Sequence, residues 1–86
     1  MMPHRLKIAT AILQLYRDQG ARAGYVIPAS VIAALSERSG WSADEVVGGI
    51  NYGYAEGWFA DARRNFLRLT DGGVAQIETL PKQEHG

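Results

Sequence analysis

The pattern of apolar and polar positions predicts two helices in the first half of the chain. In the first, apolar residues recur every three or four positions, the spacing that places them on one helix face. This helix is expected over about 4–19, and its stripe consists of Leu6, Ile8, Ala9, Ile12, Leu13, Leu15 and Tyr16. The second is expected over about 28–38, because Pro28 suits a first helical turn and Gly40 follows the last apolar position. Residues 25–27, between the two helices, predict a very short strand.

The clearest local signal in the chain begins a third helix at Ser42. Ser42 and Glu45 have the spacing of a capping box, in which each side chain accepts a hydrogen bond from the other residue's backbone N–H. Trp41 and Val46 are spaced for the hydrophobic staple that accompanies many such caps. The helix is expected over 42–57 although it contains four glycines, each costing about 1 kcal/mol relative to alanine inside a helix. These glycines are Gly48, Gly49, Gly53 and Gly57.

The spacing of the glycines indicates how this third helix packs. Gly49, Gly53 and Gly57 recur every four residues on the inward side, so bulky neighbours are expected to approach the helix closely there, and Gly57 is expected to close it. The neighbours expected from their size are Trp41, Trp58 and Tyr16. Gly48 faces outward by the same periodicity. It either lets a DNA backbone or a partner's helix come close, or it is a tolerated defect.

The last third of the chain predicts a hairpin and a short helix. Strand-forming residues on both sides of a charged turn predict a two-stranded hairpin over 58–69, with its tip at 63–65. Thr70 or Asp71 is placed to cap a final helix that reaches Leu80. The fold class is therefore mainly α with a small β-hairpin.

Composition narrows the class of protein. The 86 residues, 47% of them apolar, suit one small domain over 1–80 and a frayed C-terminal tail over 81–86. The chain has no cysteine, and its two histidines lie near opposite ends, so no metal site is expected. No segment has the length and apolarity of a membrane span, and the N-terminal residues lack a convincing cleavage site. A cytoplasmic protein without membrane contact is expected.

Neither motifs nor composition indicate catalysis. Every serine in the helical segments has a helix or cap explanation, and neither glycine pair matches a phosphate-binding loop. No enzyme activity and no cofactor are therefore expected. Nine Lys/Arg balance nine Asp/Glu, so any surface that binds nucleic acid has to be a local one.

Two stretches, LSERSGWSADEVVGGI and AEGWF…FLRLTDGG, give the chain a resemblance to the winged helix-turn-helix family over residues 4–80. The first is similar to the two helices of that motif and their turn, and the second to the wing hairpin and the start of the final helix. The resemblance implies a three-helix core, a two-stranded wing and a short C-terminal helix. It also implies a DNA-binding regulator of transcription, of a bacterial or phage type, whose recognition helix is 42–57.

Candidate DNA contacts follow from this resemblance. Asn51 is suited to a bidentate contact with adenine, Tyr52 to a phosphate or a thymine methyl group, and Gly48 to a close approach. Three arginines of the hairpin form the clearest basic patch and suit a phosphate backbone or a narrow minor groove. They are Arg63, Arg64 and Arg68, and Arg5, Lys7 and Arg38 are further candidates. Double-stranded DNA is the expected partner, with a homodimer for specific binding.

Two features depart from the family pattern. Residues 42–57 carry three acids and no base, a local charge of −3, and Gly53 stands where the family commonly buries a larger apolar residue. The acidic, glycine-smoothed face also suits a protein partner. In that second hypothesis the chain is a non-catalytic interaction module with Tyr52 and Tyr54 as anchors, because tyrosine is enriched at binding hot spots.

Overall fold

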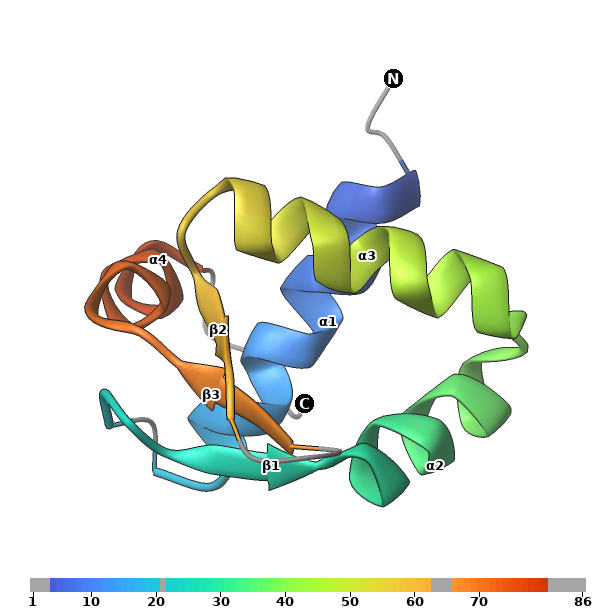
Figure 1. Ribbon diagram of the computed structural model, residues 1–86, viewed down its shortest axis with the longest axis horizontal. Helices are drawn as coiled ribbons and strands as arrows, with labels where there is room; N and C mark the ends of the chain where they lie inside the picture. Colours follow the sequence, from blue (N-terminus) through green and yellow to red (C-terminus); the bar gives the residue numbers. More distant parts are fainter. Residues whose placement is uncertain (1–3, 21, 63–65, 81–86) are drawn as a thin grey trace, which may run out of the picture.

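Four helices and a three-stranded antiparallel sheet make up the described part of the protein, residues 4–20, 22–62 and 66–80 of the computed structural model. Figure 1 shows α3 lying across α1, the sheet and α4 on one side, and α2 on the other. In chain order the elements are α1 (His4–Asp18), β1 (Val26–Pro28), α2 (Ala29–Ser39), α3 (Ala43–Ala55), β2 (Phe59–Asp61), β3 (Phe66–Leu69) and α4 (Asp71–Thr79). The expected tip at 63–65 and the expected tail at 81–86 lie outside the described residues.

The start and end of α3 confirm the local signals in the sequence. Ser42 Oγ accepts from the backbone N–H of Glu45 at 3.1 Å, and the Glu45 carboxylate accepts from the backbone N–H of Ser42 at 2.8 Å. The capping box is therefore complete. Gly57 follows the helix with a φ of 77°, a left-handed conformation that glycine adopts without strain. Gly57 therefore closes the helix, as expected. Because it is exposed, it does not belong to the inward row of Gly49 and Gly53.

The sheet has one strand more than the predicted two-stranded hairpin, because the short strand expected at 25–27 joins it. Its order is β1-β3-β2, so β1 pairs with the hairpin formed by β2 and β3 and the two-stranded expectation is corrected. Ile27 faces Leu67 on one side of the central strand, and Phe59 faces Leu69 on the other. All four side chains are buried. A lone two-stranded hairpin is only marginally stable in water. The third strand and this apolar face stabilise the hairpin by packing it against the core.

The core is built around α1. Five of its side chains have no exposed surface, namely Ile8, Ala9, Ile12, Leu13 and Tyr16. The Tyr16 hydroxyl donates to the backbone carbonyl of Leu67, and its ring stacks on Phe59 with centroids 6.0 Å apart. Burial raises the pKa of Tyr16, so the hydroxyl stays protonated. The Leu67 carbonyl satisfies this buried donor. One aromatic side chain thus fastens the central helix to the central strand.

Glycines let α1 and the sheet approach α3 closely. A methyl group at Gly49 would come within 2.7 Å of Ile8 Cβ and overlap its Cγ2, and one at Gly53 would overlap the ring of Phe59. The neighbours expected from the sequence were Trp41, Trp58 and Tyr16. Bulky side chains do approach these glycines, but the nearest ones belong to Ile8 and Phe59. At Gly53 the Phe59 ring fills the space that a larger side chain on the helix itself would need.

Gly48 does not face open solvent. It is partly buried, and a methyl group there would lie 3.5 Å from Cγ and 3.7 Å from Nε of Arg5. These are ordinary van der Waals separations. The outward-facing glycine expected from the periodicity is therefore covered by the aliphatic part of an arginine from α1.

These contacts predict opposite effects for neighbouring glycine-to-alanine substitutions. Gly48→Ala is expected to stabilise the protein by up to about 1 kcal/mol, because it gains helix propensity without a clash. Gly49→Ala and Gly53→Ala are expected to destabilise it by about 1–3 kcal/mol, because overpacking outweighs the same gain. The free energy of unfolding in urea measures all three. Equal effects at positions 48 and 49 would contradict this account of the packing.

Candidate nucleic-acid interface

The exposed face of α3 is smooth and carries no positive charge of its own. Its exposed side chains are Ala43, Asp44, Val47, Asn51 and Ala55. Asn51 is near the middle of this face, and its amide makes no hydrogen bond to any residue that the structure describes. Gly48 lies three residues before it, so the two are neighbours on the helix surface. The amide is thus presented to solvent between small side chains.

The N-terminus of α1 supplies a cation to this face. Arg5 lies over Gly48, which brings its guanidinium to the helix that has no base. Both Arg5 and Ile8 contact α3, and they are three residues apart on one face of α1. The sequence contains a signal for this contact, because the spacing of residues 5, 8 and 9 places Arg5 on the face of α1 that carries the apolar stripe.

Of the two acids at the start of α3, Glu45 has partners within the chain. Glu45 accepts from the backbone N–H of Ser42, and its second oxygen lies 2.7 Å from Nε2 of His4. The hydrogen bond from the Ser42 backbone is the main cause that lowers the pKa of Glu45, and His4 adds to it. Asp44 remains exposed, so it carries the free negative charge at this end of the face.

Both tyrosines of α3 are engaged within the chain. Tyr52 is half-buried and meets Trp58 edge to face, with ring centroids 5.7 Å apart. The Tyr54 hydroxyl donates to Oδ1 of Asp61 at 2.6 Å and so connects α3 to β2. Desolvation, followed by the hydrogen bond and the charge of Asp61, raises the pKa of Tyr54 to about 12. Tyr52 was expected on the exposed face and lies instead at its edge.

Arg68, which belongs to the described part of the hairpin, does not lie beside this face. Arg68 is exposed in the middle of β3, where its register partners are Val26 and Ala60. It alternates with the buried residues Leu67 and Leu69, so it lies on the outer side of the sheet. Arg63 and Arg64 lie outside the described residues. The structure therefore places Arg5 over Gly48, three residues before Asn51, and it leaves Arg68 on the outer side of the sheet.

The described ranges lack a metal-binding cluster and a membrane-spanning helix. Residues 4–20, 22–62 and 66–80 hold no cluster of three or more His, Asp or Glu side chains able to bind a metal ion. Over the same ranges, every helix is too short or too polar to cross a membrane.

Comparisons with protein-family models, with curated proteins and with solved structures gave no match. The function of the α3 face is therefore argued from its own residues.

The raised pKa of Tyr54 predicts that the protein loses stability at alkaline pH. Its folded-state pKa of about 12 lies above the ordinary value of 10, so folding favours the protonated hydroxyl. The stabilisation is complete below pH 10 and is lost as the pH rises towards 12. Tyr54→Phe is expected to cost about 0.5–1.5 kcal/mol at pH 8. Between pH 10 and 12 the difference from the wild type should shrink.

Urea unfolding of both proteins at a series of pH values measures that difference. Tyr25→Phe serves as the control, because it removes the hydroxyl of an exposed tyrosine. A Tyr54→Phe difference that stays constant from pH 8 to pH 12 would rule out the coupling to Asp61.

Proposed function

We propose that the chain is a winged helix-turn-helix protein that binds double-stranded DNA and regulates transcription, with α3 as the recognition helix and the β2–β3 hairpin as the wing. The order of the elements agrees with the resemblance in the sequence: a helix, a short strand, two helices joined by a tight turn, a hairpin and a last helix. The third strand is compatible with this arrangement, because it pairs with the hairpin at its base.

The observation that carries the proposal is the placement of Arg5 over Gly48, three residues before Asn51 on the same helix. An α-helix fits the major groove, where an asparagine amide is able to make two hydrogen bonds with adenine. A guanidinium next to it contributes a phosphate contact, which positions the helix without reading sequence. Arg5 provides such a cation for a helix that lacks one, and Gly48 provides the space for its aliphatic part. The two groups thus divide positioning and base recognition between α1 and α3.

The tyrosines favour DNA over the protein-binding alternative. Tyr52 and Tyr54 are both half-buried, and each has a partner within the chain. A hot-spot anchor needs an aromatic side chain that is able to enter a partner's pocket. The exposed groups that remain on α3 are the Asn51 amide, the Asp44 carboxylate and the apolar side chains of Ala43, Val47 and Ala55. The amide suits polar contacts in a groove.

The net charge of zero limits the affinity. Asp44 is exposed on α3 and repels phosphate, so non-specific binding is expected near the weak end of about 10⁻⁴–10⁻⁶ M. A single module of this size makes few contacts, so regulation of a specific site would use two copies on a two-fold symmetric sequence.

Replacing Arg5 tests the positioning role. Arg5→Gln is expected to weaken binding to all duplexes and to reduce the slope of log K against log salt by about 0.9, the value for one phosphate contact. Arg22→Gln is the matched control, because Arg22 is an exposed arginine outside both α1 and α3. Fluorescence anisotropy of labelled duplex DNA between about 50 and 200 mM salt measures both slopes. Equal slopes for the two variants would contradict the proposed role.

Two changes on α3 test base recognition and charge separately. Asn51→Ala is expected to relax preference at particular base pairs, by about 1–3 kcal/mol of lost discrimination, while the salt slope stays unchanged. Asp44→Asn is expected to tighten binding to every sequence, because it removes a charge that opposes phosphate. Selection from a random duplex library followed by anisotropy measures both effects. An Asp44→Asn variant with unchanged or weaker affinity would count against α3 as the DNA-facing helix.

A further inference from the structure

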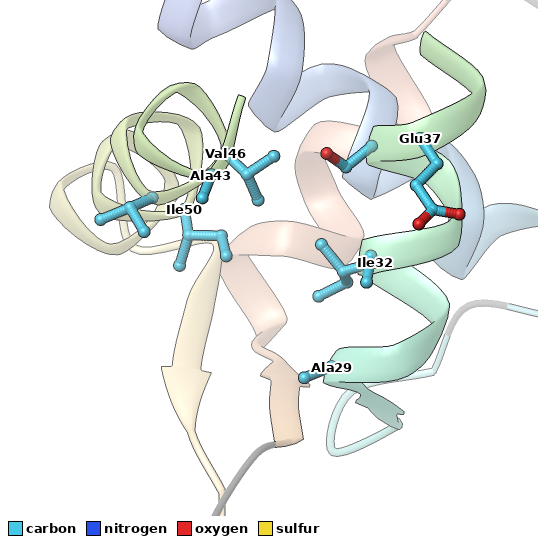
Figure 2. A pocket seen from close by; sticks show the side chains of 9 residues that line it. Ala29, Ile32, Glu37, Ala43, Val46 and Ile50 are labelled. Atoms are coloured by element: carbon cyan, nitrogen blue, oxygen red, sulfur yellow. The ribbon is translucent and has the colours of Figure 1, made fainter. Parts of the chain in front are cut away.

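An apolar groove of about 410 Å³ lies between α2 and α3. Figure 2 shows Ile32 of α2 directed across the gap towards Val46 and Ile50 of α3. Of the residues of α2, Ile32 alone is buried, and Val47 on the α3 side is 54% exposed. Hydrocarbon surface on both helices is therefore left open to solvent.

The size of the groove suits a small molecule. Ligand sites for small molecules span about 300–1,000 Å³ and are lined mainly by apolar side chains with a few polar groups. The groove is open to solvent on one side, so a compact organic molecule would lie against both helices with part of its surface in water.

The charge at the rim selects the kind of molecule. The lining includes one carboxylate, Glu37, and no basic side chain. The Glu37 side chain has no hydrogen bond or ion pair with any residue in the described ranges. The other polar group, the hydroxyl of Ser36, donates to the backbone carbonyl of Trp41 at 3.0 Å and is already used. A ligand with a positive head group would pair with the free carboxylate.

We propose that the groove between α2 and α3 binds a small amphiphilic organic cation, with its hydrocarbon body between Ile32, Val46 and Ile50 and its ammonium group at Glu37. The apolar walls favour the body by removing its surface from water. The carboxylate favours the cation over a neutral or anionic analogue of the same shape. Ala43 and Val47 belong both to the groove and to the exposed face of α3, but Arg5 and Asn51 do not line the groove, so either proposal stands without the other.

A titration with three probes of one shape tests the chemistry. The probes are 3-phenylpropylamine, 3-phenylpropanol and 3-phenylpropanoate, followed by the backbone amide signals of ¹⁵N-labelled protein. The amine is expected to shift amides of α2 and α3 around the groove and to bind about two- to fivefold more tightly than the alcohol, the range for one exposed ion pair. The carboxylate is expected to bind most weakly. Equal binding of all three probes, or shifts scattered over the surface, would overturn the proposal.

Matched variants locate the site. Ala33→Phe is expected to weaken the amine about tenfold or more, because its ring fills the groove. Ala34→Phe adds the same ring at an exposed position of α2 that does not line the groove, and it is expected to leave binding unchanged. Glu37→Gln should remove the preference for the amine, while Glu78→Gln on α4 should keep it. Circular dichroism checks that each variant is folded.

Two results would overturn the proposal. One is an Ala33→Phe variant that is folded and binds the amine like the wild type. The other is a set of groove amides that shift with protein concentration in the absence of a probe, because a second copy would then be the occupant. A preference for the amine that Glu37→Gln abolishes and Glu78→Gln keeps would support it.

Discussion

The distance between α1 and α3 is set by direct contact of Ile8 with the backbone of α3 at Gly49. A side chain of any size at that position would overlap Ile8, so the two helices are close because one of them is bare. The contact costs helix propensity, about 1 kcal/mol for each interior glycine. The capping box at Ser42 offsets part of that cost by satisfying the first N–H groups of α3. A helix weakened in its middle is thus fixed at its start and held by the core.

The same close approach produces the candidate site. Because α1 lies against α3, the first residues of α1 reach its exposed surface, where Arg5 covers Gly48 and His4 meets Glu45. The positive group of the proposed DNA surface therefore comes from a residue that precedes Gly48 by 43 positions in the chain. On the opposite side of α3 the packing is loose, and the groove towards α2 stays open. Arg5, the cation of the proposed DNA surface, thus comes from the side of α3 that packs tightly.

Local signals in the sequence predicted the helices, the cap at Ser42 and the end at Gly57, because such features depend on a few adjacent residues. Three features depend on tertiary placement and were not predicted. β1 has only three residues, and only its register beside Leu67 shows that it completes the sheet. The partners of Gly49 and Gly53, Ile8 and Phe59, are not the largest side chains. The side chain that covers Gly48 belongs to Arg5 in another helix, so the periodicity of α3 alone could not predict this contact.

A double-mutant cycle between Ile8 and Gly49 tests the central contact most directly. The free energies of unfolding of Ile8→Ala, Gly49→Ala and the double variant are compared with that of the wild type in urea. If the methyl group at position 49 is costly because it overlaps Ile8, truncating Ile8 relieves that cost, and the double variant is more stable than the sum of the single effects by at least about 1 kcal/mol. Additive effects within about 0.3–0.5 kcal/mol would contradict the account, because they would mean that the two positions do not constrain each other.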